Sequence, residues 1–197
     1  GGLRRSKLWL PPDKEDAMAR TAWVNGVFLA AEEARISPFD RGFLFADSVY
    51  EVTAVVNGAL VDFEAHLDRL ERSLRELDFA ELPGRAELAD MHRELVRANA
   101  VEEGLVYLQV TRGAYLARDF LPPPPDRTRL TMFAFAESKP LVDSAGARDG
   151  IKVALVPDIR WGRRDIKTTQ LLAPLLAKHS ARALGAQDAW LAGEDGQ

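Results

Sequence analysis

Residues 50–73 read YEVTAVVNGALVDFEAHLDRLERS, and this stretch decides the fold. Asn57-Gly58 lies between two apolar, β-prone runs, and Asn-Gly accepts the positive φ angles of a type I′ turn, so a β-hairpin is expected. From Phe63 onward, apolar residues recur at spacings of four and three, which predicts a helix capped by Asp62. A hairpin that leads directly into an amphipathic helix indicates a domain that mixes strands and helices.

Further elements on both sides of this stretch complete a first α+β domain, residues 19–137. A second Asn-Gly hairpin is expected around residues 25–26, and a second helix over 86–98. Two more strands, 104–113 and 127–138, are joined by the loop LPPPPD. Between the hairpins, the stretch ISPFDRGFLFADS is expected to be an apolar loop packed against the domain.

The remaining residues predict an extension, a linker and the beginning of a second domain. Residues 1–18 are expected to be an extension or tag remnant, and 138–150 an interdomain linker. Residues 151–197 begin a C-terminal domain with a strand and a helix, and a further strand and hairpin turn end the chain. These elements cannot bury a core of their own, so this domain is expected to be incomplete.

The helix in the second domain is expected to begin near Gln170. Pro174 is tolerated only in a first helical turn because proline has no N–H to donate. Gly185 is expected to follow the last helical residue, where a left-handed backbone conformation ends many helices.

Composition excludes several classes of protein. The chain has 197 residues, 47% of them hydrophobic, and a formal net charge of −4, which gives no reason to expect nucleic acid or an anionic membrane as a partner. Its zero cysteines exclude disulfides, thiolate zinc sites and a cysteine nucleophile, and three separated histidines give no metal site. No apolar run approaches the roughly 20 residues of a membrane span, so a cytoplasmic protein is expected.

Lys167 is the main candidate for chemistry. It lies in GRRDIKTTQLLAPLLAKHSA, residues 162–181, after Arg163 and Arg164 and next to Ile166. Desolvation and neighbouring positive charge both disfavour an ammonium, and a neutral lysine amine can form a Schiff base. The ordinary interpretation is a solvated surface lysine, and the residues alone leave both open.

Other polar residues also have two interpretations. Arg69, one turn after His66 on the same helix, can bind a phosphate or carboxylate, or form an ion pair on a solvated helix face. Tyr50 and Glu51 alternate between the faces of a strand, where packing is the ordinary role. Arg118 follows the TRG strand and can bind an anion, or be neutralised by Asp119. Neither a P-loop nor a Rossmann or Gly-x-Ser-x-Gly pattern is present.

Three stretches together resemble one family. RISPFDRGFLFADSVYEVTAVVNGALVDFEAHLDRLERS, YLQVTRGAYLARDFLP and DIRWGRRDIKTTQLLAPLLAK are similar, in this order, to the fold-type IV pyridoxal-phosphate-dependent aminotransferases. D-amino-acid aminotransferases are the most similar subgroup, and the likeness extends to branched-chain aminotransferases. It runs from about Trp23 to Trp190. It implies a two-domain α+β and α/β fold, pyridoxal 5′-phosphate as cofactor and a homodimer.

The resemblance also implies roles for individual residues. Lys167, in DIK, matches the lysine that holds the cofactor as an aldimine and then moves the α-proton of the substrate. Arg69, in HLDRL, matches the arginine that binds the cofactor phosphate. Tyr50, in VYE, matches the tyrosine that lines the substrate pocket. Glu51 and His66 match supporting positions near the site.

Two departures from the family pattern affect these implications. D-amino-acid enzymes pair an arginine with a histidine after the TRG strand to bind the substrate carboxylate. Here Arg118 is shifted in position, and Asp119 or Phe120 stands where the histidine would be, so D-specificity stays open. The family's glutamate at the pyridine nitrogen, and its small phosphate-binding residues, belong to a part of the second domain that this sequence lacks.

The resemblance predicts amino transfer from an amino acid, with D-amino acids among the candidates, to a 2-oxo acid through Lys167. One alternative is a lyase resembling aminodeoxychorismate lyase, which uses the same lysine for an elimination. A second alternative is a non-catalytic binding module of the same fold. A transaminase needs an oxo acid acceptor and a lyase does not, so dependence on the acceptor distinguishes the first two.

Overall fold

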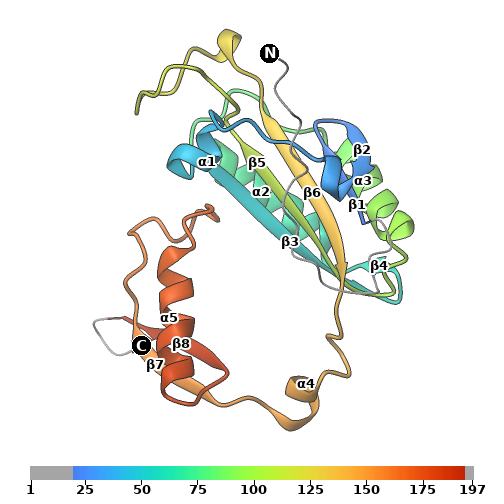
Figure 1. Ribbon diagram of the computed structural model, residues 1–197, viewed down its shortest axis with the longest axis vertical. Coiled ribbons are helices and arrows are strands. Elements are labelled where there is room, and N and C mark those ends of the chain that lie inside the picture. The colour runs from blue at the N-terminus through green and yellow to red at the C-terminus, as the bar shows by residue number, and fades with distance from the viewer. Residues whose placement is uncertain (1–19, 194–197) are drawn as a thin grey trace, which may run out of the picture.

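A computed structural model describes residues 20–193, which form a six-stranded sheet and a smaller two-stranded sheet (Figure 1). The strands are β1 (Thr21–Val24), β2 (Val27–Ala30), β3 (Ser48–Val56), β4 (Ala59–Leu60), β5 (Glu103–Thr111), β6 (Thr131–Ser138), β7 (Val153–Pro157) and β8 (Asp188–Ala192). The α-helices are α1 (Arg41–Phe45), α2 (Phe63–Glu76), α3 (Arg85–Ala98), α4 (Ala145–Asp149) and α5 (Leu172–Ala183), with 3₁₀ turns η1 (Ala31–Glu33) and η2 (Pro125–Arg127).

The large sheet has the strand order β2-β1-β6-β5-β3-β4, with every neighbouring pair antiparallel. The helices α2 and α3 cover one face of it (Figure 1). Alternate residues of each central strand face these helices, as the period of a strand requires. Val49, Val106 and Val110 are fully buried there against Leu74 and Leu95 of the two helices.

The opposite face of the large sheet carries a row of half-buried aromatic rings. Tyr50 of β3, Tyr107 of β5 and Phe135 of β6 lie in contact across the three strands, and Phe133 lies beside them. These rings lie on the face of the sheet that α2 and α3 do not cover.

Both predicted hairpins are confirmed. Asn25 and Gly26 have φ angles of 48° and 89°, and Asn57 and Gly58 have 52° and 70°, as a type I′ turn requires. The helix expected from Phe63 is also confirmed as α2. The expected cap is wrong in detail, because Asp62 adopts a left-handed conformation and its side chain accepts no capping hydrogen bond.

Two stretches expected to be irregular contain short helices. The apolar loop between the hairpins contains α1, whose first turn is capped by the Asp40 carboxylate accepting the Gly42 N–H at 2.8 Å. The expected linker, 138–150, contains α4. The domain boundaries stay a prediction. The extension expected over 1–18 and the turn expected at the chain end, 194–197, lie outside the described residues.

The small sheet is a βαβ unit in which β7 and β8 pair in parallel and α5 connects them. The helix α5 begins at Leu172, two residues later than expected, with Pro174 in its first turn as predicted. Gly185 follows its cap with φ +73°, and the N–H groups of Gly185 and Ala186 donate to the carbonyls of Arg182 and Ala181. These two bonds form a Schellman motif, so the predicted helix end is confirmed.

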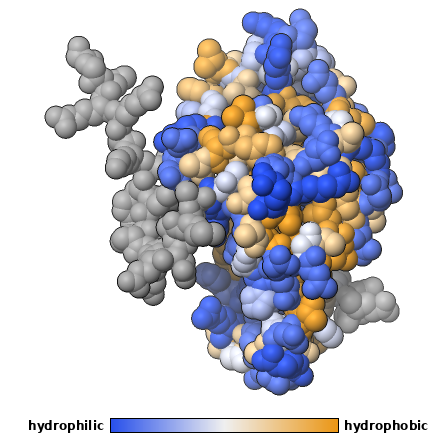
Figure 2. All heavy atoms as spheres, turned by 90° about the vertical axis from the view of Figure 1, so that its right-hand side faces the viewer, coloured by the Kyte–Doolittle hydropathy of each residue, from blue (hydrophilic) through white to orange (hydrophobic). Residues whose placement is uncertain are grey.

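The surface mixes hydrophilic side chains with apolar patches, as the face in Figure 2 shows. In the small sheet, Leu155 and Trp190 are register partners and are 72% and 63% exposed. Among residues 20–193, no helix is both long and apolar enough to cross a membrane.

Gly113, just after β5, offers a test of the packing at the end of that strand. Its φ is +91°, and a Cβ there would lie 1.8 Å from the Arg129 carbonyl oxygen. Gly26 has nearly the same φ, +89°, but open space around it. We expect Gly26→Ala to lower the free energy of unfolding by about 1–2 kcal/mol from backbone strain, and Gly113→Ala by at least about 3 kcal/mol because a clash is added.

Urea unfolding of the two glycine variants measures this difference. Equal losses of stability would contradict the close approach of Gly113 to Arg129.

Candidate active site

The segment that carries Lys167 is attached to the edge of the large sheet beside β3. The Tyr50 N–H donates to the Lys167 carbonyl at 3.0 Å, and Val49 and Thr168 form an antiparallel bridge. The Thr169 N–H then donates to the Ser48 carbonyl at 3.3 Å. Lys167 is therefore held by backbone pairing with the strand that also carries Tyr50.

The Lys167 amine lies over the face of the Tyr50 ring, with Nζ 4.2 Å from the ring centre. A cation at this distance from an aromatic face is attracted by the electron density of the ring. Both side chains line a cavity of about 160 Å³, whose other lining residues are Arg160, Trp161, Arg164, Ile166, Thr168, Gln170, Leu171 and Pro174. The predicted pair of Lys167 and Tyr50 is thus brought together in one cavity.

The arginines near Lys167 are paired with carboxylates. Arg163 lies 2.6 Å from Glu76 and 3.0 Å from Asp165. Arg164 lies 3.6 Å from Asp158, the carboxylate that Arg160 also binds, at 2.7 Å. The hydrogen bonds from Arg160 hold the pKa of Asp158 far below its ordinary value. Each of the two arginines that precede Lys167 thus has a carboxylate partner within the described residues.

Glu51, His66 and Arg69 form a second cluster on the other face of β3, because Tyr50 and Glu51 are consecutive in the strand. Arg69 donates from Nε and Nη2 to the two carboxylate oxygens of Glu51, both at 2.6 Å. His66 Nδ1 lies 2.8 Å from the same carboxylate, which is 3% exposed. The hydrogen bond with Glu51 raises the pKa of Arg69.

The ion pair of Arg69 differs from the one the sequence indicated. Its carboxylate partner is the strand residue Glu51, and Nη2 also lies 3.3 Å from Nδ1 of the helix residue His66. The Arg69 side chain is 43% exposed, and its Nη1 donates no hydrogen bond within residues 20–193. One donor group of Arg69 thus stays available for a further anion.

Arg118 lies apart from Lys167 in this chain. Its guanidinium is 5.0 Å from the centre of the Phe45 ring and 5.8 Å from that of Phe120. The buried Arg41 holds the loop just beyond Arg118 by donating to the carbonyls of Asp119, Phe120 and Leu121. No contact joins Arg118 to the cavity of Lys167 within the described residues.

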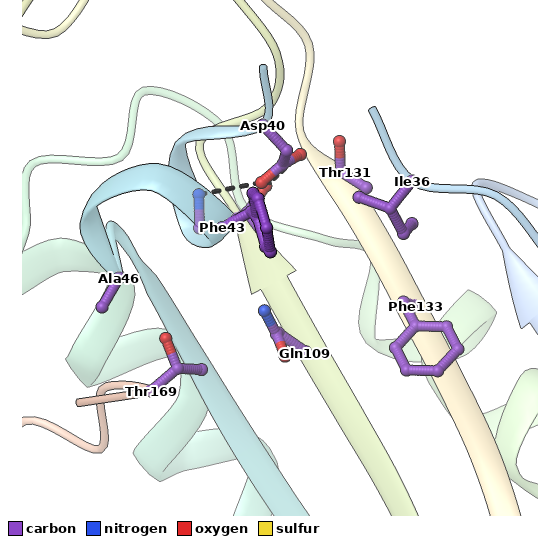
Figure 3. Close-up of a pocket in the computed structure, with 10 residues that line it drawn as sticks. Ile36, Asp40, Phe43, Ala46, Gln109, Thr131, Phe133 and Thr169 are labelled. Atoms are coloured by element: carbon purple, nitrogen blue, oxygen red, sulfur yellow. Dashed lines mark hydrogen bonds between the residues drawn. The ribbon is translucent and has the colours of Figure 1, made fainter. Parts of the chain in front are cut away.

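A larger cavity of about 460 Å³ lies on the same side of the large sheet (Figure 3). Side chains of α1, β5 and β6 surround it, together with Thr169, two residues after Lys167. Phe43 and Phe133 give the cavity apolar walls, and Gln109 is one of its few polar groups. Ligand cavities commonly have this composition. Residues 20–193 contain no group of acidic or histidine side chains that could hold a metal ion.

Comparison with known proteins identifies the family. The sequence profile described as amino-transferase class IV matches residues 48–197. The chain belongs to the class IV aminotransferase family. It is 35% identical over 167 residues to a D-alanine aminotransferase of Staphylococcus haemolyticus, and 34% over 168 residues to one of Listeria monocytogenes. Each match covers 85% of this chain and 58% of the relative, so the chain spans less than two thirds of the length of these relatives.

Solved structures show the same fold. A branched-chain amino acid aminotransferase of Escherichia coli superposes with a TM-score of 0.77 at 20% identity, over 90% of this chain and 61% of that one. A putative 4-amino-4-deoxychorismate lyase of Legionella pneumophila superposes with a TM-score of 0.68 at 16% identity, over 82% and 58%. The chain therefore has the fold-type IV aminotransferase fold that the resemblance implied.

Sequence reasoning missed several residues near the candidate site. Arg160 and Trp161 line the cavity of Lys167, and they are the last two residues of the motif DIRW, which was the available signal. Tyr107 and Gln109 reach the open face of the sheet because they alternate with buried residues of β5. The alternation of β5 could be read from the sequence, but the strand that pairs with β5 beside Tyr107 could not.

The ion pair between the buried Glu51 and Arg69 offers a test of the second cluster. Replacing Glu51 by Gln removes the negative charge that accepts two hydrogen bonds from Arg69. We therefore expect the free energy of unfolding to fall by about 2 kcal/mol. Glu94→Gln is the matched control, since Arg97 binds Glu94 through the same pair of nitrogens but on an exposed helix face. Exposed pairs contribute little.

Urea unfolding of the two glutamine variants at neutral pH provides the measurement. If Glu51→Gln were as stable as Glu94→Gln, the Glu51 cluster would not stabilise β3 against α2.

Proposed function

We propose that this protein is a pyridoxal-phosphate-dependent aminotransferase in which Lys167 binds the cofactor. The observation that carries the proposal is the Lys167 amine, which is half-buried, fixed through its backbone to β3 and placed over the Tyr50 ring. Membership of the class IV aminotransferase family supports it, as does the likeness to D-alanine aminotransferases. A primary amine in an enclosed position is the group that an aldehyde cofactor requires.

Two residues, one on each face of β3, have the chemistry that this cofactor requires. Lys167 supplies the amine for the aldehyde, and the same Nζ then holds and moves the proton of the substrate carbon. Arg69 supplies a guanidinium with one unused donor group for the phosphate, in keeping with the preference of arginine for such anions. Glu51 and His66 orient Arg69. The cofactor, when bound, supplies the electron sink of the reaction.

The proposed substrates are an amino acid donor and a 2-oxo acid acceptor. D-alanine is the first donor to test because the similar relatives are D-alanine aminotransferases. Tyr50 lines the pocket, and Arg118 is assigned to the substrate carboxylate. Because Arg118 lies away from Lys167 in this chain, that assignment needs the loop of a second subunit and so agrees with the proposed homodimer. A cytoplasmic location is part of the proposal.

Replacing Lys167 tests the reaction. We expect Lys167→Ala to abolish amino transfer, because none of the other residues among 20–193 that line the cavity carries an amine. The assay follows oxo acid formation from D- and L-amino acid donors, with and without a 2-oxo acid acceptor. Turnover without a 2-oxo acid acceptor would favour the lyase over the aminotransferase. Full activity of Lys167→Ala would contradict the proposed role of Lys167.

Replacing Arg69 tests cofactor binding. We expect Arg69→Ala to weaken retention of pyridoxal phosphate by about tenfold or more, the effect of a lost hydrogen bond to a charged group. Arg75→Ala is the control, because Arg75 lies on the same helix and its side chain binds, within residues 20–193, only the neighbouring Glu71. Dialysis followed by the visible absorbance of the retained cofactor provides the measurement. Equal retention by the two variants would contradict the phosphate role of Arg69.

A further inference from the structure

The Tyr50 ring makes a cation–π contact on one side and an aromatic stacking contact on another. Lys167 Nζ lies 4.2 Å from its centre, and the Tyr107 ring lies 5.6 Å away, inclined by only 23°. The Tyr50 hydroxyl makes no hydrogen bond within residues 20–193, so no polar contact there sets the direction of the ring. Stacking against Tyr107 is therefore an aromatic contact that limits how the Tyr50 ring can turn.

Tyr107 is itself held firmly. Its ring stacks on Phe135 of β6 at 5.2 Å and 23°, and its hydroxyl donates to the Gln109 side chain at 2.9 Å. Burial, and next to it the charge of Tyr50, raises the pKa of Tyr107 to about 12, so the hydroxyl keeps its proton at neutral pH. The contacts with Phe135 and Gln109 therefore hold the Tyr107 ring in place, with Phe135 on the side away from Tyr50.

The register of the strands explains why Tyr107 reaches Tyr50. Tyr50 lies directly opposite Gln109 in the pair of β3 and β5, so Tyr107 is its diagonal neighbour. Diagonal positions on one face are within reach of aromatic side chains. The rings of three strands, β6, β5 and β3, thus form one continuous row that ends at Lys167.

We propose that Tyr107 is a positioning residue, which fixes the Tyr50 ring and through it the place of the Lys167 amine. This inference rests on the proposed function, because it concerns the same lysine. Tyr107 itself does not line the cavity of Lys167, so it acts through Tyr50. Small displacements of a reacting group slow a reaction strongly, and the rate at which Lys167 captures an aldehyde should therefore depend on Tyr107.

The test measures the rate at which pyridoxal phosphate is captured by the purified protein, from the growth of visible absorbance. Borohydride reduction and peptide mapping then assign the product to Lys167. We expect Tyr107→Leu to slow capture by about tenfold, and Tyr107→Phe, which keeps the ring, to slow it by less than about twofold. Leu105→Ala is the control, since Leu105 lies two residues away on the same face of β5.

A double-mutant cycle separates positioning from a general loss of stability. If Tyr107 acts through Tyr50, Tyr107→Leu should slow capture no further in a Tyr50→Leu background, because interacting residues are not additive. Additive effects would overturn the inference, as would capture by Tyr107→Leu at the rate of Leu105→Ala. Tyr107→Met, with a flexible apolar side chain, takes the place of Tyr107→Leu if that variant does not fold.

The two proposals fail differently in this experiment. If the unsubstituted protein captures no cofactor at Lys167, the proposed function is overturned and the inference with it. If the unsubstituted protein captures cofactor and Tyr107→Leu does so equally fast, only the role of Tyr107 is overturned.

Discussion

The hydrogen bond from the Tyr50 N–H to the Lys167 carbonyl is the interaction on which the site depends. It joins two segments that are far apart in the chain, and it places the Lys167 side chain on the same side of the sheet as Tyr50. The bridge between Val49 and Thr168 and the bond from Thr169 to Ser48 extend the pairing in both directions. A strand edge has unused donors and acceptors, and here the segment of Lys167 occupies them.

The alternation of β3 divides the polar residues of the site between two environments. Tyr50 faces the open side and meets the lysine, whereas Glu51 faces α2, where Arg69 and His66 surround its buried carboxylate. Burial of a charge is costly unless it is paired and hydrogen-bonded, and Glu51 satisfies both conditions. The cluster of Glu51 can therefore hold α2 in register with the strand that aligns Lys167.

Local features of the fold could be predicted from the sequence, and non-local pairings could not. Asn-Gly turns, the apolar spacing of α2 and the glycine after α5 act over a few residues, and each was predicted correctly. The ion pair of Arg163 with Glu76 was not predicted, because the two residues lie 87 positions apart in the sequence and meet only in the folded chain. The pairing of Arg69 with Glu51 was hidden for the same reason.

The position of Lys167 is set by the large sheet more than by the small one. Ile166, the residue before it, is 3% exposed and belongs to the same apolar core as Val49 and Leu70, with Trp161 packed against that core. The small sheet has two strands and one helix and leaves Leu155 largely exposed, and so few elements give little independent stability. The position of Lys167 is therefore set by β3 and the core beneath it. A substitution in that core should displace the lysine more than a substitution in β7 or β8.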